Sequence, residues 1–113
     1  MSAFFDSEVV RKEMTDIQEL QEEVYGNVFQ FPQMDREEQA EHIETLVELL
    51  SKQRILYTRM SLSDDPAAKK MKENIQQSAV MMGMPKDVDM SNVFKNMEKM
   101  IEVMRQQVDR KPS

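Results

Sequence analysis

The chain has 113 residues, which is enough for one domain around a single core, and we assign residues 1–113 to that domain. It contains no cysteine, which excludes disulfides and thiolate chemistry, and its net charge of −6 disfavours binding to nucleic acid phosphates. No apolar run approaches the roughly 20 residues that cross a bilayer, and acidic residues near the N-terminus argue against a signal peptide. We therefore expect a cytoplasmic protein that binds neither nucleic acid nor membrane.

The first predicted helix spans about residues 6–28. Asp6 is its expected N-cap, because Phe5 before it and Val10 after it then have the spacing of a hydrophobic staple. Apolar residues follow at helical spacings of three and four: Val10, Met14, Ile17, Leu20, Val24 and Val28. Pro32 disfavours helical geometry in the residue before it, so the helix should end ahead of a short link. A link that short makes the first two helices antiparallel neighbours.

The longest predicted helix covers residues 35–60, a stretch without glycine or proline. Asp35 is its expected N-cap, and Glu38 follows at the spacing of a capping box. Acidic residues crowd its first half and basic residues its second half, the order that the helix dipole favours. Its apolar stripe is wide enough to contact two neighbours and consists of Ala40, Ile43, Leu46, Val47, Leu49, Leu50, Leu56, Tyr57 and Met60.

Two further helices are predicted over residues 66–82 and 89–109. Pro66 suits the first position of a helix with Asp65 as its N-cap, and Gly83 suits the end of that helix. Asp89 is the expected N-cap of the last helix, and Ser91 two residues later is a rival.

These elements predict an all-α protein, an antiparallel bundle of four helices joined by short links in up-down-up-down order. The longest helix extends beyond its neighbours, so dimerisation would be one way to complete the bundle. The predicted core consists of Ile17, Val24, Ile43, Val47, Leu50, Ile75, Phe94, Met97, Ile101 and Met104.

The sequence offers little for catalysis or metal binding. A di-iron carboxylate bundle needs Glu-x-x-His on two helices, whereas this chain has a single histidine, His42, which we assign to an exposed acidic helix surface. A serine nucleophile of the Gly-x-Ser-x-Gly type is absent from the sequence. We therefore predict no enzyme activity, no catalytic or metal-binding residues and no cofactor.

Methionine is unusually frequent: twelve occur, eight of them in the last two predicted helices and their link. Thioethers can bind Cu(I), but several spacings are those of core positions, and no cysteine or second histidine joins them. Methionine is also common at adaptable binding surfaces, and three residues at 81–84 are too close together for all to face one core. With phenylalanines at the edges of the stripes, they form a candidate interaction surface of Phe4, Phe5, Phe29, Phe31, Met81, Met82 and Met84.

This apolar surface predicts self-association as a two-fold homodimer, because monomers rarely leave such surface uncovered. The exposed faces of residues 35–60 and 89–109 are the expected contact. Exchange of the first or last helix between subunits, through the links at Pro32 or Met84, is an alternative arrangement.

Four stretches together resemble a small family of unknown function that occurs in cyanobacteria and their T4-like phages, with the closest likeness to phage members. These are residues 3–10 (AFFDSEVV), 56–66 (LYTRMSLSDDP), 82–85 (MGMP) and 88–90 (VDM). The resemblance implies an intracellular helical protein and supplies no activity or site residue.

The sequence therefore predicts a non-enzymatic protein–protein interaction module, regulatory or scaffolding, whose partner it does not identify. It would act in the cytoplasm of a cyanobacterium or of a phage-infected cyanobacterial cell. A virion-associated structural protein is the alternative, and a metal-binding or catalytic bundle ranks behind both.

Overall fold

The computed structural model describes residues 3–81, 83–87 and 89–110, and within them it is entirely helical. Its elements are α1 (Glu8–Asn27), the 3-10 helix η1 (Val28–Gln33), α2 (Arg36–Leu62), α3 (Pro66–Met81) and α4 (Met90–Asp109). The prediction of an all-α fold with four packed helices is confirmed.

Aspartates begin three of these helices, as the sequence predicted. The Asp35 carboxylate accepts the Glu38 N–H at 2.8 Å, and Asp65 accepts the Ala67 N–H at 2.9 Å. Asp89 accepts the backbone N–H of Ser91 at 2.9 Å, so Asp89 rather than Ser91 is the cap of α4. Each carboxylate satisfies a backbone donor that the first turn of a helix leaves without a partner.

The start of the first helix differs from the prediction. Ser7 is the N-cap of α1, and Asp6 instead pairs with Arg11 at 3.3 Å. The reason is a long-range contact: the Phe4 N–H donates to the Asp65 carboxylate at 2.8 Å, which holds the N-terminal segment in a turn beside the start of α3. The predicted end of this helix agrees with the structure within one residue, since α1 ends at Asn27, and residues 28–33 after it form η1 with Pro32 inside it.

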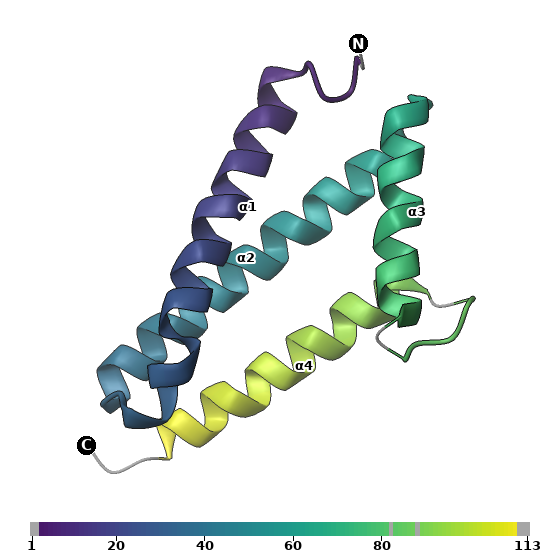
Figure 1. The fold of residues 1–113 in the computed structure, drawn as a ribbon. Helices are drawn as coiled ribbons and strands as arrows, with labels where there is room; N and C mark the ends of the chain where they lie inside the picture. The colour runs from purple at the N-terminus through teal and green to yellow at the C-terminus, as the bar shows by residue number, and fades with distance from the viewer. Residues whose placement is uncertain (1–2, 82, 88, 111–113) are drawn as a thin grey trace.

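Helix α2 is the axis of the fold, and α1 lies antiparallel across it (Figure 1). Two ion pairs show the relative direction of α1 and α2: Glu13 with Arg59 at 2.8 Å, and Asp16 with Lys52 at 3.3 Å. As residue numbers rise along α1, they fall along the facing part of α2, which is the antiparallel order predicted from the short link.

Helix α4 also runs antiparallel to α2, along another side of it (Figure 1). Arg105 pairs with Glu44 at 2.6 Å, and Glu98 pairs with Arg54 about two to three turns away along the two helices. Helix α3 crosses the C-terminal end of α2 and bridges towards the beginning of α4 (Figure 1). Helix α2, the longest, therefore makes most of the contacts that hold the other three helices in place.

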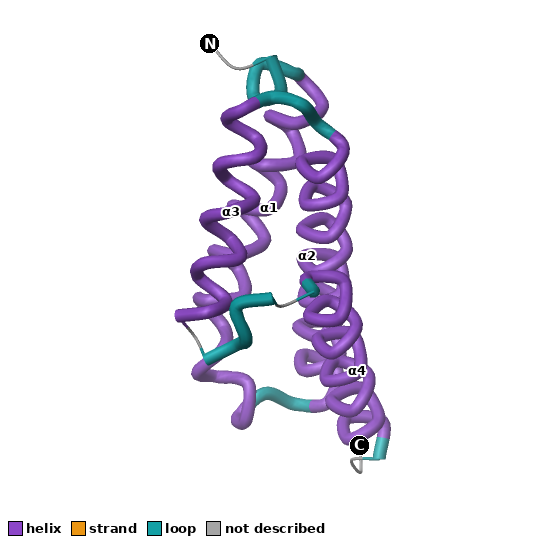
Figure 2. Tube along the Cα trace, turned by 90° about the vertical axis from the view of Figure 1, so that its right-hand side faces the viewer, coloured by secondary structure: helices purple, strands orange, loops and turns teal. Residues whose placement is uncertain are grey.

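The molecule is broad and thin, with principal extents of 52, 32 and 20 Å. Figure 2 shows two layers of helices, with α1 and α3 on one side and α2 and α4 on the other. Since packed helices lie about 8–10 Å apart, 20 Å is the thickness of two layers.

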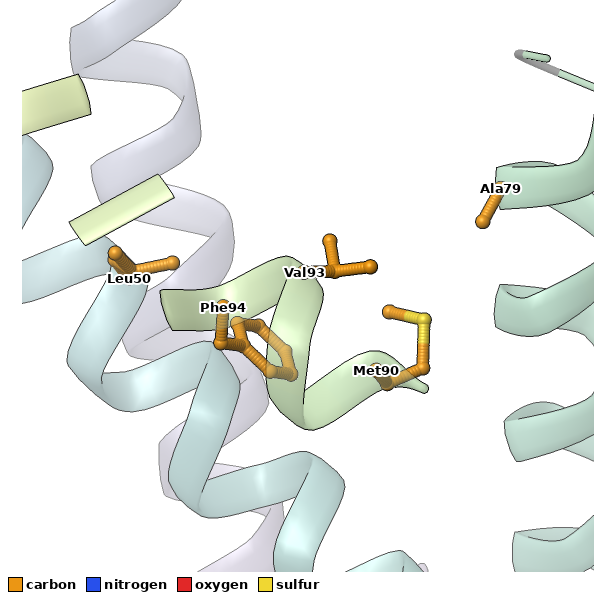
Figure 3. Packing of buried hydrophobic residues seen from close by; sticks show 5 residues of the cluster. All are labelled: Leu50, Ala79, Met90, Val93 and Phe94. Atoms are coloured by element: carbon orange, nitrogen blue, oxygen red, sulfur yellow. The ribbon is translucent and has the colours of Figure 1, made fainter. Parts of the chain in front are cut away.

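The described side chains form two buried clusters at the two ends of the α3 crossing. The first joins α2, α3 and α4 and contains Leu50, Ala79, Met90, Val93 and Phe94 (Figure 3). The second joins α1, α2 and α3 and contains Val10, Leu56, Met60 and Ala68. Tyr57 and Ile75 pack against both clusters and link them.

Most of the residues predicted for the core are buried or half-buried, but the prediction is wrong for Val47 and Met97. Their side chains are 37% and 41% exposed, respectively. Val47 lies at the outer edge of the contact between α2 and α4, and Met97 lies at an opening between α1 and α4. In a closed bundle a helix would cover each position, whereas here α3 crosses the end of α2 and, in the part of the chain described, leaves both sides open.

Candidate protein-interaction site

An open groove of about 520 Å³ lies between the four helices and receives side chains from each of them. Helix α2 provides the floor, α1 and α4 provide the walls, and α3 closes one end. The residues that line it are Met14, Ile17, Gln18, Gln21, Gln53, Leu56, Tyr57, Met60, Met71, Ile75, Met90, Phe94 and Met97.

The chemistry of this groove is apolar and uncharged. Of the described residues that line it, five are methionines, and the polar groups are three glutamine amides and the phenol of Tyr57. Methionine side chains are flexible and polarizable, so a wall made of them adapts to the shape of an apolar ligand. Such a groove suits the apolar face of a protein segment and offers no ionic group to a charged one.

Tyr57 stands where the two buried clusters meet the groove. Its ring packs edge to face on Phe94 with centroids 5.9 Å apart, and its hydroxyl accepts the Gln76 amide N–H at 3.2 Å. Lys72 Nζ lies 5.8 Å from the ring centroid. Burial raises the pKa of Tyr57, although the Gln76 hydrogen bond opposes the shift. The phenol therefore keeps its proton near neutral pH and can act as a hydrogen-bond donor.

The chain exposes more surface than a compact monomer of its size. Its accessible area is 8212 Å², whereas a folded monomer of 13.3 kDa is expected to expose about 6,500 Å². The radius of gyration is 16.1 Å, against about 13 Å for a compact domain of this length. The surplus of about 1,700 Å² comes from the thin, open arrangement.

The structure does not bring the predicted interaction residues together in one patch. Phe4 and Phe5 contact each other edge to face and pack, half-buried, on the cluster at the start of α3. Met84 is half-buried against the other cluster, and Met82 lies outside the described residues.

Of the remaining predicted residues, Phe29 and Phe31 lie on η1 and Met81 lies at the end of α3. Phe31 is half-buried on the His42 ring, with centroids 5.2 Å apart. Phe29 on η1 is 91% exposed and Met81 at the end of α3 is 87% exposed, so each is a single exposed apolar side chain. The groove was missed because Met14, Met60, Met71 and Met97 lie on stripes that sequence reasoning assigned to the core. The unusual number of methionines could have indicated the groove, but the methionines predicted to bind a partner were those at residues 81–84, near the end of α3.

The prediction that His42 lies on an exposed helix surface is wrong, because its side chain is 7% exposed. The 3-10 helix η1 covers this part of α2, and the Gln39 amide donates to the Phe31 carbonyl at 2.7 Å. Burial lowers the pKa of His42, and the nearby carboxylate of Glu23 opposes that shift. Among the described residues, histidine, aspartate and glutamate side chains form no group of three that could hold a metal ion.

The described helices include none that is both long enough and apolar enough to cross a membrane.

Comparison with protein families finds a match over residues 2–108 to a domain of unknown function (DUF1825). Curated proteins and solved structures provide no match to this chain.

Proposed function

This chain belongs to the DUF1825 family, and we propose that it is a non-enzymatic protein–protein interaction module with a regulatory or scaffolding role. Its binding site is the groove between the four helices. The resemblance to proteins of cyanobacteria and their phages supports a place in the cytoplasm of a cyanobacterium or of an infected cell.

The open, uncharged groove is the observation that carries this proposal. A single-chain protein gains stability by burying apolar side chains, yet here about 520 Å³ lined mainly by methionine and aliphatic residues stays accessible. The accompanying surplus of about 1,700 Å² exceeds the roughly 800 Å² that each partner buries in an interface of standard size. A protein partner would cover this surface.

Two features favour binding over catalysis. The lone imidazole, His42, lies beneath η1 and is not one of the residues that line the groove. The polar groups in the groove are amides, which do not titrate, and a phenol whose pKa burial raises further from neutral pH, so none of them has the pKa near neutrality that suits general acid–base catalysis.

Affinity capture with matched variants tests the proposal. The double variant Gln18→Glu, Gln21→Glu places two negative charges on the α1 wall of the groove without removing a buried apolar side chain. Gln30→Glu, Gln33→Glu is the control, because it makes the same chemical change at exposed positions of η1. Each purified protein is immobilised and exposed to cyanobacterial lysate, and the retained proteins are quantified by mass spectrometry.

We expect a small set of proteins to be retained by the wild type and the control and lost from the groove variant, because an apolar segment would have to desolvate the new charges. If the three baits retain the same proteins in the same amounts, the groove does not recruit a partner from the lysate.

A further inference from the structure

Helix α4 carries two apolar seams, of which α2 covers one. Met90, Phe94 and Val108 are buried, and Phe94 packs towards α2 in the cluster with Leu50 (Figure 3). The second seam consists of Val93, Met97, Met100 and Met104, at spacings of four, three and four. This is the heptad spacing by which one helix packs along another.

The middle of the second seam, Met97 and Met100, is exposed, whereas Val93 is buried and Met104 is half-buried. Val93 is buried near Ala79 of α3, but Met97 is partly exposed and Met100 is 67% exposed. Met97 also lines the groove, so the seam and the groove form one continuous apolar surface.

The charges of α4 lie away from this seam. At about 100° per residue, Lys95, Lys99 and Glu102 fall on the opposite side of the helix. Glu98 and Arg105 turn towards α2, where they form ion pairs. The residues beside the seam on its outer edge, Asn96, Val103 and Gln107, are uncharged.

We infer that a second copy of this chain covers the seam, with the two α4 helices packed antiparallel around a two-fold axis near Met100. In this register Met100 meets its counterpart, and Met97 meets Met104 of the other copy. The inference rests on the proposed interaction function and names the occupant of the surface next to the groove.

Charge and area both favour a second copy. Two chains that each carry a net charge of −6 repel one another, and the seam is a face on which no charged side chain adds to that repulsion. A strongly basic or acidic partner would find no opposite charge on it. The surplus surface of each chain, about 1,700 Å², is larger than the roughly 800 Å² that each subunit buries in an interface of standard size.

Light scattering on the purified full chain gives the first test. We expect a mass twice the 13.3 kDa of one chain, and half that value for Met100→Glu, which would place two carboxylates against each other at the axis. Met81→Glu is the matched control, since Met81 is also exposed but lies on α3, and it should keep the dimeric mass. Met100 is exposed in the monomer, so circular dichroism should show an unchanged fold in both variants.

Disulfide trapping gives the register, because the natural chain has no cysteine. Met100→Cys should form a covalent dimer under mild oxidation, and Lys99→Cys, on the far side of the helix, should not. A mixture of Met97→Cys and Met104→Cys chains should form more mixed disulfide than either chain forms with itself. A parallel pairing would reverse that last result.

The results separate this inference from the proposed function. A wild-type mass of 13.3 kDa that does not rise with concentration overturns the dimer, whereas groove-dependent capture from lysate would still support the interaction function. A dimeric mass that survives Met100→Glu, with no disulfide at position 100, shows that copies pair through another face and overturns the α4 seam. Loss of both the dimer and groove-dependent capture removes the proposed function as well.

Discussion

The clearest test of the open fold compares Leu50→Ala with Val47→Ala, two changes on the same apolar stripe of α2. A closed bundle predicted from the sequence treats both side chains as core. In the structure Leu50 is buried beside Phe94 of α4, whereas Val47 lies at the edge of the α2–α4 contact and is partly exposed. The two substitutions should therefore differ in their effect on the free energy of unfolding.

The expected magnitudes follow from the groups that are removed. Leu50→Ala deletes three buried carbons, about 2.4 kcal/mol of transfer free energy, and adds the cost of the space left behind. Because Leu50 borders a shallow opening between α2 and α4, neighbouring groups can relax and the added cost is small, so we expect a total loss of about 2.5–3 kcal/mol. Val47→Ala deletes two partly exposed carbons, and the higher helix propensity of alanine offsets much of that loss, so about 0.5 kcal/mol or less is expected.

Urea denaturation followed by far-ultraviolet circular dichroism measures the difference. All three proteins should be compared at one concentration, because the stability of a self-associating protein depends on it. Leu50→Ala should lower the urea midpoint by about 1–2 M, and Val47→Ala should leave it nearly unchanged. Equal losses for the two variants would refute the open arrangement, and a loss below about 0.5 kcal/mol at Leu50 would refute the packing of α4 on α2.

Three further predictions concern local structure. Gly26→Ala should stabilise the protein by about 0.5–1 kcal/mol, since a Cβ there meets no described atom within 4 Å. Gly83→Ala should destabilise it by about 1–2 kcal/mol, because φ at Gly83 is +103°. Thermal melts of the two variants check both signs. Asp35→Ala should cost about 0.5–2 kcal/mol through loss of the α2 cap, and Asp35→Asn should restore most of it in the same melts. Burial lowers the folded-state pKa of His42, so its stabilising contribution is complete above the unfolded pKa of 6.5 and is lost as pH falls through the folded pKa. The urea midpoint should therefore decline less over this pH range in His42→Phe than in the wild type. An identical decline in both proteins would contradict the burial of His42.

Local sequence signals were sufficient to find the helices. Asp35, Asp65 and Asp89 were each recognised as N-caps because a carboxylate beside an apolar periodic run satisfies the donors of the first turn, whatever the rest of the chain does. The antiparallel pairing of α1 with α2 also followed from chain connectivity, since a short link leaves few other arrangements. Fold class and helix order are therefore properties of short segments in this protein.

The spatial relation among helices depended on contacts that no local pattern reports. The start of α1 is set by the bond from Phe4 to Asp65, groups 61 positions apart, and His42 is buried because η1 folds over it. Most important, apolar periodicity shows which side of a helix avoids water but not which neighbour covers it. Because α3 crosses the end of α2, the stripes that include Met14 and Met97 end at an open groove, and residues predicted for the core become the candidate binding surface.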